Sequence, residues 1–335
     1  MKILIISPTQ SGIGGIAQHV TGLTKFLKKN GHDIEIISSE NTFTIPIKGL
    51  KNPSFMLSSS LKTRFMKKYD IVHAHNIPSA KAMKNAKGKK ILTLHGIFSE
   101  QIEMLHGKTT SSISKNFESN ALEWADAITV VSKEAQEHYH KLGFETYHIP
   151  NAIDIDGLPK SEKKMYDKQI IYVGRLSKEK GILELLTTMK ELPSYIDLLI
   201  IGNGPEEETV KQASKQENIH YLGYLPPEQT IPLVRGSDIL IQPSLIEGIS
   251  TSILEAMACQ TVIIATNVGG NKEILSDQTT GILIQNHSEI LKTLDELYSD
   301  PQLRESIIKN AFNEVQKYDW KNVGKQYFEL YSSLS

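Results

Sequence analysis

The segment "KILIISPTQSGIGGIAQHV", residues 2–20, decides the fold class of the first half of the chain. It passes from an apolar run typical of a buried strand, through a glycine-containing loop, into the periodic pattern of a helix over 15–29. The same alternation continues along the chain. Further strand patterns are "DIEIIS", "YDIVHAH", "KKILTLHG" and "AITVVS", and further helix patterns are 112–124 and 133–142. Strands that alternate with helices indicate βαβ units and a parallel sheet.

The glycines of this loop raise the alternative of a dinucleotide-binding protein. Gly12, Gly14 and Ala17 fit the G-x-G-x-x-[GA] spacing, and Asp33 follows at about the distance of a ribose-binding acid, with Glu35 close behind. However, residues 8–11 separate the strand from the first glycine, so the turn comes too late to lie tightly under a pyrophosphate. Asp33 also opens a strand, whereas a ribose-binding acid normally lies at the carboxyl end of one. We therefore expect the loop to serve a different phosphate ligand.

The second half repeats the alternation after a break. The polar stretch "HIPNAIDIDGLPKSEKKMYDK" predicts a linker over 151–168. New strand patterns follow it, in "QIIYVG", "IDLLIIG", "NIHYLG", "DILIQPS", "TVIIAT" and "GILI", and the chain ends in helix patterns over 288–299, 301–316 and 320–332. We predict Rossmann-like domains over 1–152 and 153–318 that face a central cleft, with a C-terminal helix (319–335) that returns to pack on the first.

Bulk composition limits the class of protein. The 335 residues, with 39% hydrophobic and 22% charged side chains, fit about two folded domains. A single cysteine, Cys259, rules out an internal disulfide and favours a reducing compartment. No apolar run approaches the roughly 18 residues needed to span a bilayer, and the start "MKILIIS" is too short for a signal-peptide core. We expect a cytoplasmic protein.

Charge is distributed unevenly. Residues 1–155 carry 19 Lys or Arg and 13 Asp or Glu, whereas residues 156–335 carry 18 and 25. Within 48–90, a single acid, Asp70, stands against eleven basic residues: Lys48, Lys51, Lys62, Arg64, Lys67, Lys68, Lys81, Lys84, Lys87, Lys89 and Lys90. The run is either a solvated face or a contact to an anionic partner, such as a phosphate-linked acceptor or the inner surface of a membrane. Aromatic residues are few among these charges, so we do not expect the interleaved pattern of nucleic-acid binding.

The most informative stretch is "QPSLIEGISTSILEAMACQTVIIATNVGGNKEI", residues 242–274. It predicts a strand, a loop containing Glu247, and a helix that places Glu255 one turn from its start. Carboxylates suit paired sugar hydroxyls, and the backbone N–H groups of 249–251 would lie at a helix N-terminus, where they can donate to an anion. Alternatively, Glu255 is a solvated helix residue and Glu247 a simple loop acid.

Two further loops follow predicted strands. In "IIYVGRLSKEKGI", a strand is followed by Gly174 and Arg175, and Lys180 lies just before a helix. Two such cations could neutralise a diphosphate without a metal, although a surface pairing with Glu179 is the alternative. In "IIGNGPEEE", glycines allow the backbone to approach a ring or phosphate closely.

Taken together, these motifs resemble the retaining, nucleotide-sugar-dependent glycosyltransferases of family 4, which have the GT-B fold. Glu247 and Glu255 match the family's E-x7-E, and matching motifs are "VGRLSKEKG", "GNGPEEE", "ITVVSKE", "IPNAIDI" and the tail "YDWKNVGKQYFELY". The resemblance covers nearly the whole chain and is loosest over 40–125. The chain departs from the family at Gln260 and Val262, where glycine and proline are usual, and at Ser250, which is often proline.

The resemblance implies a role for each matching residue. Glu255 would hold the donor ribose, Arg175 and Lys180 the diphosphate, and Glu247 would face the donor sugar beside the amides of 249–251. His95, in "TLHG", would lie near the reacting sugar carbon. The implied catalytic residues are His95, Arg175, Lys180 and Glu247, and the implied donor-binding residues are Gly14, Gly15, Gly174, Gly202, Gly204, Leu225, Ile249, Ser250, Thr251 and Glu255.

Other patterns point to a metal only weakly. Asp154 and Asp156 imitate a D-x-D clamp but lie in the predicted linker. His73 and His75 share one face of a strand, yet no third ligand is evident nearby, so we expect cleft-lining or core histidines. Cys259 lies in the apolar stripe "LEAMAC" and is predicted to be core.

We therefore expect a metal-independent, retaining hexosyl- or N-acetylhexosaminyl-transferase. Its donor would be a UDP-sugar, or else a GDP-sugar, and its acceptor a glycan or lipid-linked hydroxyl in polysaccharide or glycolipid biosynthesis. No cofactor and no nucleic-acid partner are expected, and residues 48–90 could place the protein at the inner face of a membrane. The alternatives are a sugar-nucleotide epimerase or phosphorylase, or a non-catalytic sugar-nucleotide sensor, on the same fold.

Overall fold

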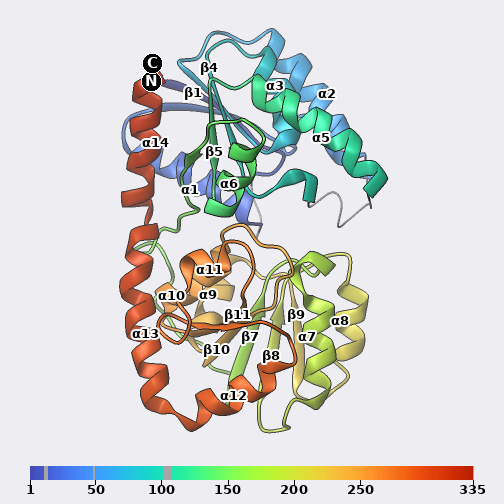
Figure 1. The fold of residues 1–335 in the computed structure, drawn as a ribbon, viewed down its shortest axis with the longest axis vertical. Coiled ribbons are helices and arrows are strands. Elements are labelled where there is room, and N and C mark those ends of the chain that lie inside the picture. Colours follow the sequence, from blue (N-terminus) through green and yellow to red (C-terminus); the bar gives the residue numbers. More distant parts are fainter. Residues whose placement is uncertain (11–13, 48–49, 101–107, 335) are drawn as a thin grey trace. The chain divides into compact units, whose positions relative to one another are not determined.

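The chain forms two compact units in the computed structural model. The structure describes residues 1–10, 14–47, 50–100 and 108–334. In the helix that begins at residue 108, side chains are described from residue 116 onward. The first unit comprises Met1–Ala152 together with Trp320–Ser335, and the second comprises Ile153–Asp319. Figure 1 shows an open sheet flanked by helices in each unit. Among the described residues, every helix is too short or too polar to cross a membrane.

The first sheet is entirely parallel. Its order is β2-β1-β3-β4-β5-β6. The strands are β1 (Lys2–Ile6), β2 (Asp33–Ile37), β3 (Ile71–His75), β4 (Lys89–Leu94), β5 (Ala127–Val130) and β6 (Tyr147–His148). From β1 the chain adds β2 on one side and then β3 on the other, so the order of strands reverses between β1 and β3. The loops after these two strands therefore flank the switch point, where open α/β sheets bind ligands.

Alternate side chains of β1 point to opposite faces of the sheet, and each face is covered by a different set of helices. Leu4 and Ile6 belong to one core cluster, and Ile3 and Ile5 to the other. The first cluster packs under α2 (Lys51–Arg64), α3 (Ile77–Asn85), α5 (Lys108–Glu123) and α6 (Lys133–Lys141). The second packs under α1 (Gly15–Lys29) and α14 (Trp320–Leu334). The first unit is thus a three-layer α/β fold.

Helix α14 belongs to the first unit because it packs closely on α1. A Cβ added to Gly22 would lie 2.0 Å from the Trp320 ring, and one added to Gly324 would lie 2.6 Å from the Phe26 ring. These two glycines let the aromatic side chains of the opposite helix lie against the backbone. Tyr331 completes the contact, since its hydroxyl lies 2.6 Å from Nδ1 of His73 on β3.

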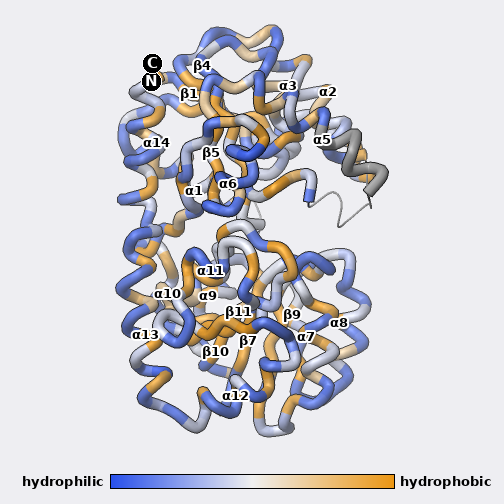
Figure 2. The backbone as a smooth tube through the Cα atoms, in the orientation of Figure 1, coloured by the Kyte–Doolittle hydropathy of each residue, from blue (hydrophilic) through white to orange (hydrophobic). Residues whose placement is uncertain are grey.

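The second sheet is also parallel, and its order β12-β11-β10-β7-β8-β9 is that of a dinucleotide-type Rossmann fold. The strands are β7 (Gln169–Val173), β8 (Asp197–Ile201), β9 (Ile219–Gly223), β10 (Ile239–Gln242), β11 (Val262–Thr266) and β12 (Ile282–Ile284). Their central residues are mostly apolar, as the orange segments of Figure 2 show, because helices cover the sheet. Its switch point lies between β7 and β10.

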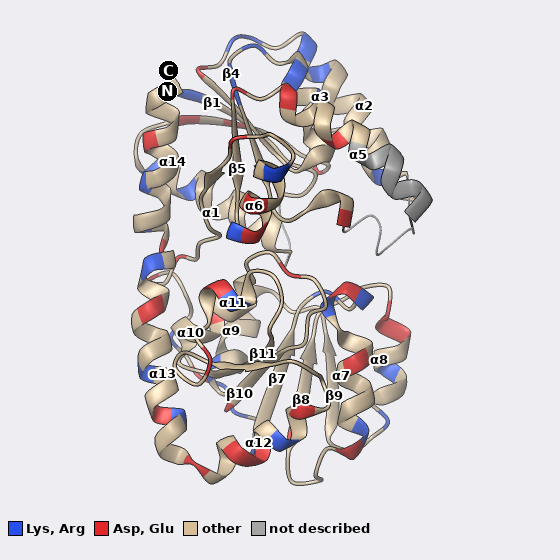
Figure 3. Ribbon diagram, viewed as in Figure 1, with Lys and Arg blue, Asp and Glu red and all other residues tan. Residues whose placement is uncertain are grey.

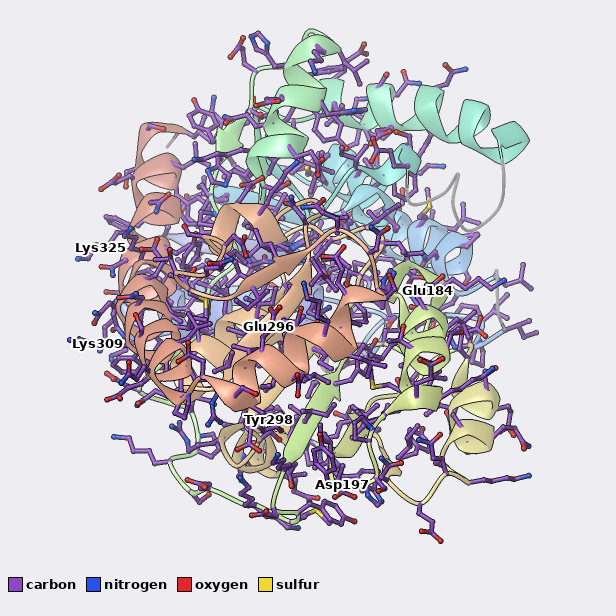
Figure 4. All side chains as sticks on the ribbon, turned by 60° about the horizontal axis from the view of Figure 1, so that its bottom comes forward. Glu184, Asp197, Glu296, Tyr298, Lys309 and Lys325 are labelled. Atoms are coloured by element: carbon purple, nitrogen blue, oxygen red, sulfur yellow. The ribbon has the colours of Figure 1, made fainter. Side chains whose placement is uncertain are left out.

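Helices and short 3-10 turns connect these strands. They are η1 (Lys178–Lys180), α7 (Ile182–Thr188), η2 (Met189–Glu191), α8 (Glu207–Ala213), α9 (Pro227–Arg235), α10 (Thr251–Cys259), α11 (Asn271–Ile274), α12 (Glu289–Ser299), α13 (Pro301–Val315) and η3 (Gln316–Tyr318). Figure 4 shows side chains of this unit that include Glu184 on α7, Asp197 at the start of β8 and Glu296 on α12. These acids contribute to the negative charge of the second half.

The expected fold class of two Rossmann-like domains is confirmed, and every quoted strand pattern forms a strand. Cys259 is buried, and burial raises its pKa to about 12. Helices α2 and α3 were not predicted. Helix α2 escapes notice because its inward face carries Ser59, Ser60 and Thr63 rather than a periodic apolar stripe.

Candidate functional site

The candidate donor site lies in the second unit, where the loops after β7 and β10 meet. These strands are neighbours, with Ile239 opposite Ile170 and Leu240 opposite Ile171. Their carboxyl ends therefore open at the switch point of the sheet. The loop after β7 contains Arg175 and leads to Lys180, and the loop after β10 contains Glu247.

Lys180 and Glu247 form the central ion pair of this site. Nζ of Lys180 lies 2.8 Å from each carboxylate oxygen of Glu247. The Glu247 side chain is only 7% exposed and also accepts from Ser244 Oγ at 3.0 Å and Gln242 Nε2 at 3.2 Å. The carboxylate is thus fixed by three donors. Lys180 is 27% exposed, so its ammonium stays within reach of a ligand.

Backbone contacts bring η1 against the loop that follows β10. The carbonyl of Glu179 accepts from Leu245 N at 3.0 Å and from Ile246 N at 3.3 Å. Gly181 has φ +67°, and a Cβ there would lie 1.8 Å from the Pro243 carbonyl oxygen. Only glycine fits both the left-handed conformation and this approach. Residues 67 apart in sequence are therefore held together before any ligand binds.

Arg175 has a different environment. Its side chain is 61% exposed, and its Nη1 lies 3.8 Å from Oε1 of Glu179. This is the surface pairing that the sequence left as an alternative, and at such exposure it contributes little to stability. The guanidinium can therefore turn to an anion at little cost.

Three glycines let the loops at this sheet edge pack together. Gly174 N donates to the Ile201 carbonyl at 3.0 Å. A Cβ on Gly202, at φ +146°, would lie 1.8 Å from the Gly174 carbonyl oxygen, and one on Gly204 would lie 2.3 Å from that of Leu176. In the described structure these glycines thus serve loop-to-loop packing.

Helix α10 starts at the same sheet edge. Ser250 caps it, with its hydroxyl accepting from Ile253 N at 3.4 Å, and Thr251 is the first helical residue. Ile249 and Glu255 are both buried, so Glu255 is not the solvated helix acid of the alternative interpretation. Leu225 follows β9 and is half-buried, with its carbonyl accepting from Thr230.

The carboxylates also affect a buried tyrosine. Burial, and then the negative charges of Glu247 and Glu179, raise the pKa of Tyr172 far above its usual value. Its hydroxyl donates to the Arg175 carbonyl at 2.8 Å, so it stays protonated and holds that loop. The tyrosine is a support for the site.

In the first unit, the glycine loop follows β1. Gly14 is the N-cap of α1 at φ −66°, and a Cβ there would meet no atom of the described residues within 4 Å, while Gly15 begins the helix. The described residues therefore leave the space next to Gly14 open to a ligand. Gly12 lies outside the described residues.

His95, itself half-buried, lies beside the buried imidazoles of His19 and His75. Nε2 of His95 is 3.2 Å from Nδ1 of His75, and the ring of His19 is 4.9 Å from that of His95. His19 Nδ1 lies 3.1 Å from Asn151 Oδ1. His95 N donates to Asn76 Oδ1 at 2.9 Å, which fixes the start of the loop after β4.

Burial keeps these rings neutral. It is the largest cause that lowers the pKa of His95 to about 4 and that of His73 to about 3. The pKa values of His19 and His75 also lie well below 6.5, mainly through burial and then through the neighbouring imidazoles. A neutral imidazole can accept or donate a hydrogen bond at neutral pH.

The structure adds potential metal ligands that the sequence pattern around His73 and His75 did not indicate. Near His75 the sequence showed no third ligand, but one nitrogen each of His19, His75 and His95 lies within 4.8 Å of the others. This is the group of potential ligands that the described residues bring together. His19 went unnoticed although its place in the buried stripe of α1, beside Val20 and Leu23, was readable. In the predicted D-x-D segment, the Asp154 carboxylate instead accepts from Gly157 N at 3.1 Å.

Comparison with known families gives two consecutive matches. The model described as Glycosyltransferase Family 4 matches residues 13–156, and that described as Glycosyl transferases group 1 matches residues 156–314. Together they leave only the two ends of the chain unmatched.

Similar sequences span almost the whole chain. A phosphatidyl-myo-inositol mannosyltransferase of Mycolicibacterium smegmatis is 23% identical over 100% of this chain and 94% of its own. An uncharacterized glycosyltransferase of Methanocaldococcus jannaschii is 26% identical over 95% and 94%.

Similar solved structures agree on the fold. Sucrose-phosphate synthase from Thermosynechococcus elongatus has a TM-score of 0.79 at 20% identity, covering 99% of this chain and 98% of its own. Anabaena HepE in complex with UDP-glucose has a TM-score of 0.75 at 20% identity, covering 99% and 100%.

Proposed function

Since this chain belongs to the family 4, group 1 glycosyltransferases, which transfer sugars from nucleotide sugars, we propose that it is a retaining enzyme that uses a nucleoside-diphosphate hexose or N-acetylhexosamine. The observation that carries the proposal is the pair Lys180–Glu247 at the β7–β10 switch point. A cation and a carboxylate at one sheet edge match the two parts of such a donor, the diphosphate and the sugar.

Each part of the donor has candidate partners. Lys180 and Arg175 would hold the diphosphate, together with the N–H groups at the start of α10, whose helix dipole favours an anion. Glu247 would accept from sugar hydroxyls. Glu255, on the next turn of α10, would accept from the ribose hydroxyls.

Lys180 would change partners when the donor binds. In the described structure its ammonium is neutralised by Glu247. An incoming diphosphate offers more negative charge, so the ammonium would move toward it while Glu247 keeps Gln242 and Ser244 as donors. The carboxylate released in this way would then be available to the sugar hydroxyls.

The reaction would exchange one bond for another on the same face of the sugar. The bond between the anomeric carbon and the diphosphate oxygen breaks, and a bond from that carbon to the acceptor hydroxyl oxygen forms. The hydroxyl proton passes to the departing diphosphate oxygen. Negative charge grows on the leaving group, where Lys180 and Arg175 stabilise it electrostatically.

His95 is the residue that the family resemblance implies near the reacting sugar carbon. Because burial holds its pKa near 4, the ring is neutral at working pH and would act on the reacting sugar as a hydrogen-bond partner rather than as a cation. Charge stabilisation would come from Lys180 and Arg175, without a metal. The rate of sugar transfer in EDTA should therefore equal the rate in buffer. If EDTA lowers the rate and added Zn²⁺ restores it, the enzyme uses a metal, and His19, His75 and His95 would be its candidate ligands.

The structure of Anabaena HepE in complex with UDP-glucose supports a UDP-sugar donor. The mycobacterial relative is named for a lipid acceptor, phosphatidyl-myo-inositol, which supports a lipid-linked or glycan hydroxyl as the acceptor. The test has two steps. Thermal-shift screening with UDP-, GDP- and ADP-sugars should identify one donor class that stabilises the protein. With that donor, free nucleoside diphosphate should accumulate only when an acceptor is added. Release without acceptor, or stabilisation by none of the donors, would refute the proposal.

A further inference from the structure

Helix α2 and its two caps present four apolar side chains outward. Leu50, at the N-cap, is 46% exposed, Leu57 59%, Leu61 62% and Phe65, at the C-cap, 84%. Their spacing of seven, four and four residues places them on one face of the helix. We call these four residues the α2 stripe. A stripe with this spacing normally faces a protein core.

The orientation of the helix is fixed from the opposite side. Phe55, Ser59, Ser60 and Thr63 are buried against the first unit. Asn85 on α3 donates from Nδ2 to the Ser60 hydroxyl at 2.7 Å and its carbonyl at 3.3 Å. Turning the stripe inward would break these bonds and expose Phe55. The outward stripe is therefore the packed arrangement of this helix.

Basic residues border the stripe. Lys51, Lys62 and Arg64 on α2 and Lys67 and Lys68 after it are all exposed, and residues 41–69 contain no acid. Lys67 has a weak contact to Glu35 at 3.8 Å. Figure 3 shows the basic residues in blue on α2 and α3. Before the helix, Phe43 and Ile47 add apolar side chains that are 74% and 58% exposed.

We propose that the α2 stripe and its basic border dock the first unit on a membrane surface that contains anionic lipids. An interfacial helix of this type inserts its apolar residues below the headgroups while lysine and arginine side chains bind the anionic headgroups. A second copy of the chain fits less well, because a two-fold contact would place the same uncompensated basic residues opposite one another. This inference does not depend on the donor site.

The test is flotation of the full chain with vesicles. With vesicles of phosphatidylcholine and phosphatidylglycerol in equal parts, the wild-type protein should float, and with pure phosphatidylcholine much less. The variant Leu57→Ser/Leu61→Ser/Phe65→Ser should bind the anionic vesicles at least tenfold more weakly. Its matched control, Leu142→Ser, removes a leucine of the same unit that is 54% exposed and should bind normally.

Charge is tested separately. Lys62→Glu/Arg64→Glu should weaken binding at least tenfold, and Lys28→Glu/Lys29→Glu, at the exposed end of α1, should not. Vesicle binding by Lys180→Ala should equal that of the wild type, so failure of membrane docking and failure of the proposed transfer are distinguishable. Equal flotation of the triple-serine variant, or a concentration-dependent dimer that this variant abolishes, would overturn the inference.

Discussion

Nζ of Lys180 lies 2.8 Å from both carboxylate oxygens of Glu247, so a cation predicted to bind phosphate is already paired with an acid predicted to face sugar. The pair is held by backbone contacts between η1 and the loop after β10. The free site is therefore close to neutral, and a diphosphate must compete with Glu247 for the ammonium.

Replacing this lysine tests the charge-stabilising role. Lys180→Ala should lower turnover by about 10²–10³, the usual cost of losing one donor that stabilises a developing anion. Steady-state transfer kinetics would measure it. The control is Lys178→Ala, in the same turn but exposed, which should keep normal turnover. Turnover of Lys180→Ala within threefold of the wild type would contradict the assignment.

The space beside Gly14 allows a test of the first glycine loop. Gly14→Ala introduces a Cβ that meets no atom of the described residues within 4 Å at an ordinary φ of −66°, so the melting temperature should fall only slightly, by the loss of a glycine N-cap. If a ligand approaches this backbone, kcat/KM should nevertheless fall by about tenfold or more, equivalent to about 1.4 kcal/mol. Normal kinetics in a normally folded Gly14→Ala variant would place the ligand elsewhere.

Two glycines of the second unit separate packing from conformational strain. Gly202→Ala would put a Cβ 1.8 Å from the Gly174 carbonyl oxygen, whereas at Gly223, with φ +72°, a Cβ meets no atom of the described residues within 4 Å. We expect Gly223→Ala to cost about 1–2 kcal/mol from its backbone conformation alone, and Gly202→Ala to cost more. Hydrogen exchange of peptides from β7 and β8 would compare them, and equal protection in both variants would argue against the close packing.

The buried histidines predict that acid destabilises the first unit. Burial lowers the pKa of His95 to about 4 and of His73 to about 3, while in the unfolded chain each is near 6.5. Above pH 6.5 the full stability is present. Below it the unfolded chain binds more protons, so the free energy of unfolding falls by up to about 1.4 kcal/mol per pH unit for each such histidine.

Tryptophan fluorescence can follow this effect, because Trp124 and Trp320 are the chain's two tryptophans and both belong to the first unit. The denaturation midpoint should drop steeply between about pH 6.5 and pH 5. His140→Gln, which removes an exposed histidine of the same unit, should leave that slope unchanged, while His19→Gln should flatten it. A midpoint independent of pH in this range would contradict the burial of neutral histidines.

Local pattern was enough for most of the fold. Apolar runs such as 170–173 and 239–241 are continuous because parallel strands are covered on both faces, and this pattern is readable without the tertiary structure. Helix α2 was missed because its buried side chains are mostly small and polar. This polar face is buried because α3 packs against it, and the sequence of residues 51–64 alone does not indicate that contact.

By itself, the sequence determined two Rossmann-like sheets, the loops that end their strands and the residue types of the candidate donor site. These features can be read from the sequence because strand periodicity, glycine positions and helix starts depend on residues that are close together in the chain. Only the tertiary structure decided that Lys180 binds Glu247, that His19 and His75 surround His95, and that α2 turns its leucines outward. Each of these depends on contacts between segments far apart in the chain, and their relative positions follow from the packing of whole elements.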